Sequence, residues 1–207
     1  MNQVTLAVVL CLDHSLTQEH GVFSLEQNSK RLEIIKKPSL LGFFLTHTNY
    51  MQKLPYISKP IIVSQEMCDH NGHMNVNYYY KLFDSVYTDM YCSDLGFDDK
   101  YLQSGFSTFT LEDSIRYLKE FRLDDKVYPS FHLAKVNKKL LHFVGILHNE
   151  NHELSAIFET VLAHMDLNAR KVSEFKSDKL NNLIDYTKAN PLQESLPFEL
   201  RLKIKDI

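Results

Sequence analysis

The chain has 207 residues, of which 44% are apolar and 24% charged, and its formal net charge is −3 at pH 7. This length suits one domain, or one domain with an appendage, and the apolar content allows a sizeable core and argues against wholesale disorder. The charge balance lacks the basic excess of a nucleic-acid-binding protein, so we expect no nucleic-acid partner.

The cysteines and the apolar start of the chain bear on its location. Cys11, Cys68 and Cys92 are widely spaced and odd in number, a pattern that favours a reducing compartment. The stretch TLAVVLCL near the start is too short to span a bilayer and lacks the cationic residues that open a secretory signal. We therefore expect a cytoplasmic protein without a membrane partner.

The first quarter of the chain differs from the rest. Residues 1–55 show no sustained hydrophobic period, which predicts an N-terminal extension that is irregular or weakly packed. Met51 stands where a compact domain could begin, so an over-long start of the chain is an open alternative. The predicted organisation is this extension, a main domain over residues 56–175, and a C-terminal helix and tail over residues 176–207.

The main domain opens with a strand, a polar turn and a long helix. PIIVSQEM (residues 60–67) is rich in β-branched residues and predicts a strand, and DHNGHMN follows as the turn. Apolar residues then recur at steps of three or four from Val76 to Met90, which predicts a helix over residues 76 to about 93 capped by Asn75 or Asn77. Additional tyrosines widen its apolar stripe, as in a buried helix.

Strand-like runs and a closing helix complete the chain. The first run, residues 106–121, alternates on one parity through Phe109, Leu111 and Ile115, which places Glu112 on the other face. One long helix followed by several strands predicts an α+β domain with an antiparallel sheet. The further runs cover residues 126–137, 138–149 and 153–167, and the closing helix covers residues 176–189.

The order of these segments carries a resemblance to a known family. The chain resembles hotdog-fold acyl-CoA thioesterases of the 4-hydroxybenzoyl-CoA type, which show an Asp, a nearby Gly and a long helix, and later a Y-L-x-E…D strand end. These residues are Asp69, Gly72, Tyr117, Leu118, Glu120 and Asp125. The segments NGHMN, LEDSIRYLKE, KLLHF and AIFETVLAHMD are most similar to the betainyl-CoA thioesterase branch, which also occurs fused to carnitine dehydrogenases. The resemblance covers roughly residues 57–175.

This resemblance implies a hotdog fold, in which an antiparallel sheet wraps around the central helix, and hydrolysis of an acyl-CoA to a free acid and CoA. It implies no metal or cofactor, since CoA is part of the substrate, and a homo-oligomer (a dimer or a dimer of dimers) with the active site at the subunit interface. Where the branch tends to have D-A-K-R-L-H, this chain has VNKKLLH over residues 136–142, so the identity of the acyl group stays open.

Asp69 is the predicted catalytic carboxylate, acting either as the nucleophile or as a general base toward water. The alternative reading is an Asp that only builds a turn before a helix. By analogy with the family, the backbone N–H near Val76 would donate to the thioester carbonyl, because N–H groups at a helix start are unpaired. Gly72 would let the chain approach the substrate closely.

The remaining candidates depend more on the resemblance. His73 is a candidate for binding substrate or orienting Asp69, Asn75 for capping the helix or donating to the thioester, and Glu112 for a second carboxylate. His142 is a weaker substrate-binding candidate.

No metal site is expected, because the histidines near Asp69 lack a second ligand cluster. Two other functions are alternatives on the same fold: a non-catalytic acyl-CoA-binding module keeps the fold without turnover, and a hydratase would need a G-D-x-N-P motif that the sequence lacks. An interaction protein would not explain the polar cluster at the helix start.

Overall fold

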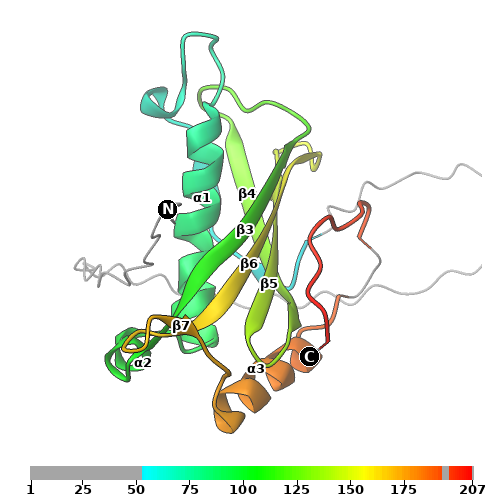
Figure 1. Ribbon diagram of the computed structural model, residues 1–207. Coiled ribbons are helices and arrows are strands. Elements are labelled where there is room, and N and C mark those ends of the chain that lie inside the picture. Colours follow the sequence, from blue (N-terminus) through cyan, green and yellow to red (C-terminus); the bar gives the residue numbers. More distant parts are fainter. Residues whose placement is uncertain (1–52, 193–195, 207) are drawn as a thin grey trace, which may run out of the picture. The chain divides into compact units, whose positions relative to one another are not determined.

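The computed structural model describes residues 53–192 and 196–206. Most of the predicted extension, residues 1–55, therefore lies outside the described residues. The described chain forms an antiparallel sheet with the long helix α1 (Val76–Asp89) packed on one face (Figure 1), which confirms the predicted α+β architecture. No helix of this described part is long and apolar enough to cross a membrane. The cytoplasmic location stays a prediction.

The sheet has the order β1-β4-β5-β6-β3, with β2 beside β4 and β7 beside β6. Its four long strands are those that the sequence predicts. The strands are β1 (Tyr56–Ile57), β2 (Ile61–Ile62), β3 (Phe106–Tyr117), β4 (Lys126–Val136), β5 (Leu140–His148), β6 (Leu154–Asp166) and β7 (Lys171–Val172). The predicted strand over residues 60–67 is wrong for most of its length, since only β2 is extended and a 3-10 turn, η1 (Gln65–Met67), follows it.

The long helix begins and ends close to its predicted bounds. Asn75 caps its start, and a π-helical turn, η2 (Met90–Asp94), continues its end. The helix packs against one face of the sheet and leaves Val76 and Tyr80 exposed, so within this chain the sheet covers only part of its circumference. The predicted closing helix is also confirmed, as α3 (Ser177–Ala189). Helix α2 (Asp99–Gln103) was not predicted.

Aromatic rings fill the layer between α1 and the sheet. Phe83 stacks on Phe158 of β6 with ring centroids 4.8 Å apart, and it meets Phe131 of β4 edge to face. Gly145 of β5 lies directly under these rings, where an added Cβ would come within 2.8 Å of Phe131 and 3.0 Å of Phe83. The absence of a side chain there lets the helix approach the centre of the sheet.

Strand β3 contains a β-bulge that contradicts the predicted alternation. Thr110 and Glu112 pair with consecutive residues of β6, so Leu111 is the extra residue. Phe109 therefore shares a face with Glu112, whereas Ile115, opposite Phe158, faces α1. Because one added residue reverses the faces of all later residues, strict parity through residues 109–115 was wrong.

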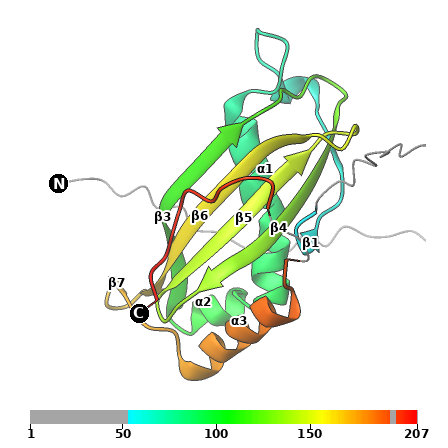
Figure 2. The same ribbon diagram turned by 90° about the vertical axis from the view of Figure 1, so that its right-hand side faces the viewer.

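The opposite face of the sheet is covered by the C-terminal strap, defined as residues 196–206. Figure 2 shows this segment crossing the sheet on the side away from α1. Leu202 and Ile204 are buried against Val161 of β6, and Phe198 packs on a cluster that includes Ile157. The strap thus closes a second apolar layer, a role that the sequence did not predict for this tail.

A buried carboxylate fixes the strap to the sheet. Glu159 of β6 is fully buried, and its two oxygens accept hydrogen bonds from the backbone N–H of Arg201, each at 3.0 Å, and from that of Leu202 at 3.0 Å. The Arg116 guanidinium lies 3.3 Å from the same carboxylate, and His142 Nε2 lies 3.3 Å away. Since a buried charge requires such partners, this network stabilises the strap.

Candidate active site

The DHNGHMN segment forms a tight turn between η1 and α1. The backbone N–H of Gly72 donates to the carbonyl of Asp69 at 3.0 Å, and the N–H of Asp69 donates to the carbonyl of His73 at 3.1 Å. Gly72 has φ +79°, in the left-handed region that favours glycine, so this residue lets the turn close. The turn brings Asp69 and His73 face to face at the start of the helix.

The Asp69 carboxylate is held by two donors from its own turn. Its Oδ1 accepts from the Asn71 N–H at 2.8 Å, and its Oδ2 accepts from the Asn75 side-chain amide at 3.3 Å. The Asn71 hydrogen bond is the main reason that the pKa of Asp69 lies below its ordinary value, and Asn75, His73 and His70 add to this effect. Asp69 is therefore ionised at neutral pH, and its side chain remains partly open to solvent.

Asn75 joins this carboxylate to the start of α1. Its side-chain oxygen accepts from the Asn77 N–H at 3.0 Å, which caps the helix, while its amide nitrogen donates to Asp69. The N–H of Val76, the first residue of the helix, has no acceptor among residues 53–192 and 196–206. Val76 is 51% exposed and lines the cleft described next, and its N–H lies at the positive end of the helix dipole.

An open cleft of about 210 Å³ lies beside this helix start. One wall comes from the turn and the first helical turn, and the other from the end of β3 and the residues after it. Its lining residues are His73, Met74, Val76, Tyr79, Tyr117, Leu118, Lys119 and Glu120. Three predicted site features, the DHNGHMN turn, the helix start and the Y-L-x-E segment, therefore meet in one place.

Two charged residues line the cleft, Lys119 and Glu120, and each pairs with an oppositely charged side chain outside the lining. The Arg122 Nε donates to Glu120 at 2.8 Å, and the Lys119 ammonium contacts Glu153 across the strand end. All four side chains are exposed to solvent by more than a third. Glu120 and Arg122 thus form an exposed ion pair, and the inner wall of the cleft is left mainly aromatic and apolar.

Two predicted site residues lie elsewhere. Glu112 is exposed on β3 opposite Val161, on the face of the sheet away from α1. His142 is buried on that same face under the C-terminal strap, beside Glu159. The structure does not bring either residue to the Asp69 turn within one chain, and their proposed roles stay predictions.

The structure adds Tyr79 and Tyr117 to the cleft. Tyr79 belongs to the apolar stripe of α1 and is only 3% exposed, but it also lines the cleft. It meets Tyr117 edge on, with ring centroids 5.0 Å apart. The sequence signal for Tyr117 was the Y-L-x-E strand end, whereas nothing in the helical period distinguished Tyr79 from its neighbours.

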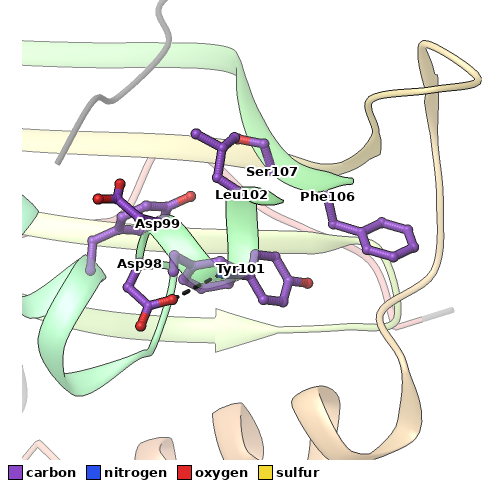
Figure 3. Close-up of a pocket in the computed structure, with 8 residues that line it drawn as sticks. Asp98, Asp99, Tyr101, Leu102, Phe106 and Ser107 are labelled. Carbon is purple, nitrogen blue, oxygen red and sulfur yellow. Dashed lines mark hydrogen bonds between the residues drawn. The ribbon is translucent and has the colours of Figure 1, made fainter. Parts of the chain in front are cut away.

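A second hollow lies at α2 and is too small for a substrate. Its volume is about 10 Å³, room for roughly one water molecule. Figure 3 shows Asp98 turned back toward α2, where it accepts a hydrogen bond from the Tyr101 N–H at 2.9 Å as a helix cap. Within the described ranges, moreover, no three His, Cys, Asp or Glu side chains are grouped to hold a metal ion.

Comparison with known proteins agrees with this geometry. The model of the thioesterase-like superfamily matches residues 63–183, which is more than half of the chain. The chain belongs to this superfamily. The match starts just before the Asp69 turn and includes α1, the four long strands and the first part of α3. The predicted family is thereby confirmed.

Several curated proteins are similar in sequence to this chain. The L-carnitine dehydrogenase/betainyl-CoA thioesterase of Rhizobium meliloti (strain 1021) is 31% identical over 110 residues, which cover 53% of this chain and 22% of that protein. The betainyl-CoA thioesterase of Pseudomonas aeruginosa is 27% identical over 139 residues, which cover 65% of this chain and 87% of that protein. The chain thus spans only about a fifth of the length of the first, fused relative.

Solved structures of other proteins share the fold. A hypothetical protein from Staphylococcus aureus, solved in complex with CoA, matches with a TM-score of 0.64 at 23% identity, over 73% of this chain and 96% of that one. The DHNA-CoA thioesterase of the same organism matches with a TM-score of 0.57 at 19% identity, over 65% and 91%. These likenesses confirm the hotdog fold.

Proposed function

We propose that this protein is an acyl-CoA thioesterase that hydrolyses a small acyl-CoA to a free acid and CoA. The observation that carries the proposal is the link from Asp69 through Asn75 to the start of α1, where Val76 is half exposed and its N–H has no acceptor among the described residues. Thioester hydrolysis requires a carboxylate and a donor for the oxyanion; here Val76 lines the cleft, and Asp69 lies in the turn whose residues His73 and Met74 form part of its wall. The names of the curated relatives support the same chemistry.

In the proposed reaction, the thioester carbonyl lies near the Val76 N–H. As general base, Asp69 takes a proton from water while the hydroxide oxygen bonds to the carbonyl carbon, and the Val76 N–H stabilises the oxyanion. Collapse of the tetrahedral intermediate breaks the C–S bond, and the CoA thiolate leaves and receives the proton from Asp69. As nucleophile, Asp69 would instead form an anhydride that water then hydrolyses. Neither route requires a metal or a redox cofactor.

The acyl group that fits the cleft is small. A volume of about 210 Å³ lies below the usual range of about 300–1,000 Å³ for small-molecule pockets. The rings of Tyr79 and Tyr117 meet at a right angle there, and aromatic faces attract quaternary ammonium groups. We therefore propose a betainyl-like acyl group, as the names of the relatives also suggest.

The proposed enzyme acts as a dimer or as a dimer of dimers. Strand β3 ends the sheet order, so its outer edge has no partner strand among the described residues. Leu111, Tyr117 and Leu118 along this edge are each about half exposed, at 57%, 48% and 52%. A long edge strand with apolar side chains favours pairing with a second copy, which would border the cleft. The mass from sedimentation equilibrium tests this, and a monomer at micromolar concentration would contradict it.

The proposed activity is tested by release of free thiol from a panel of acyl-CoAs, including betainyl, short-chain and aromatic acyl groups. Asp69→Asn keeps an oxygen to accept from Asn71 but cannot act as a base, so we expect kcat to fall by about 100-fold or more. Asp185→Asn, the same change at an exposed acid of α3, serves as the matched control and should keep wild-type activity.

A binding module is the alternative outcome. It would show acyl-CoA binding by calorimetry with no thiol release from any substrate of the panel, and Asp69→Asn would then change nothing. For an active enzyme, multiple turnovers in oxygen-18 water separate the two routes, because a label in the Asp69 carboxylate identifies the anhydride.

A further inference from the structure

The Asp69 turn is held from the side by the segment that follows β3. The N–H of Met74 donates to the carbonyl of Phe121 at 2.7 Å, and His73 forms a β-bridge with Arg122. Met74 in turn is bridged to Cys68, the residue before Asp69. The position of the turn therefore depends on the position of residues 119–122.

This segment has left the sheet by the time it reaches the turn. Its last sheet contacts are from the N–H groups of Leu118 and Lys119, which both donate to the carbonyl of Ser155. Phe121 is fully buried, so its backbone groups cannot rely on water for hydrogen bonds. Some other group must fix the chain between Lys119 and Phe121.

The Tyr79 hydroxyl is that group. It donates to the carbonyl of Lys119 at 3.4 Å and accepts from the N–H of Phe121 at 3.2 Å, so it bridges two backbone groups. Tyr79 sits on the first turn of α1, the same helix whose start carries the Val76 N–H. One hydroxyl thus connects the helix to the segment that supports Asp69.

We propose that Tyr79 is a positioning residue for Asp69; this proposal rests on the thioesterase function proposed above. Its hydroxyl holds residues 119–121 against α1, and Phe121 then holds Met74 and the turn. The Asp69 carboxylate and the Val76 N–H are thereby kept at a fixed separation, which a reaction at a single carbonyl requires. The action is through backbone hydrogen bonds and needs no contact between the hydroxyl and substrate.

The test is Tyr79→Phe, which keeps the ring in the cleft wall and removes only the hydroxyl. Tyr87→Phe is the matched control, because Tyr87 is a similarly buried tyrosine of α1 with no hydrogen bond to the 119–122 segment. We expect kcat of Tyr79→Phe to fall about 10-fold to 100-fold with KM little changed, since small misplacement of a catalytic group has this effect. The control should behave as wild type.

Hydrogen exchange supplies a readout independent of activity. In Tyr79→Phe the amides of Met74 and Phe121 should exchange about tenfold faster or more than in Tyr87→Phe, while amides at the centre of β5 stay protected. Unchanged exchange at Met74, or a loss of activity confined to KM, would overturn the proposal. If the wild-type protein hydrolyses no acyl-CoA, the proposed function fails, and the exchange result still decides whether Tyr79 holds the turn.

Discussion

Removing the charge of Glu159 should loosen the C-terminal strap and strongly destabilise the protein. In Glu159→Gln the side chain keeps its shape, but one oxygen becomes an NH₂ group facing backbone donors. In the wild-type protein the backbone N–H of Arg201 donates to both carboxylate oxygens, so the variant loses at least one of these two contacts. The Arg116 guanidinium, only 15% exposed, loses its counterion.

The size of the effect follows from burial. Breaking a buried ion pair by removing one partner costs about 3–5 kcal/mol in the free energy of unfolding. Because Arg116 keeps some access to water, we expect the lower end, about 3 kcal/mol, for Glu159→Gln. For a chain of this length, that corresponds to a fall of about 6–12 °C in the melting temperature.

Urea denaturation measures this difference, and Glu153→Gln is its control. Glu153 pairs with Lys119 at the surface, where an ion pair contributes little because both charges remain solvated. Hydrogen exchange at Arg201 and Leu202 should accelerate in Glu159→Gln alone. If both variants unfold at the same urea concentration, Glu159 does not fix the strap and the reasoning is refuted.

Two further predictions concern pH. His132 and His148 are buried, and burial lowers the pKa of each to about 4, so the folded state keeps them neutral where the unfolded chain already binds protons. Stability should therefore fall as the pH drops from about 6.5 to about 4, by about 1.4 kcal/mol per pH unit for each histidine, and equal urea midpoints at pH 7.5 and 5.0 would contradict this. Asn75→Ser keeps a helix cap, so stability should change by less than about 0.5 kcal/mol. It removes the amide that donates to Asp69, so the pKa of Asp69 should rise and the acid limb of the kcat–pH profile should move to higher pH; an unmoved limb would show that Asn75 only caps.

The parts of the fold that were predicted are those with a regular hydrophobic period. Helix α1 buries one apolar face, and strands β4, β5 and β6 each bury a continuous run of residues; both patterns are visible in the sequence. The bulge at Leu111 and the strap were not predictable in this way. A bulge depends on how two strands pair, and the strap is held by a carboxylate more than 40 residues earlier in the chain.

In the candidate site, too, the roles that could be predicted are those of residues close together in the sequence. Asp69, Gly72 and Asn75 are local to one turn, and their roles in that turn follow from residue type and spacing. Glu112 and His142 came from the resemblance alone, and the structure places them on the far face of the sheet. The contribution of Tyr79 depends on a segment 40 residues away, which no local pattern indicates.

Because of the strap, the folded unit extends beyond the last residue of the superfamily match. The match ends at residue 183, yet residues 196–206 supply the backbone donors of Glu159 and cover Val161 and Ile157. A polypeptide cut at residue 183 would leave the buried Glu159 without its backbone donors and an apolar sheet face open to water, so it should be prone to aggregate. Recombinant versions of this protein should therefore keep the chain through Asp206, with any tag joined through a flexible linker.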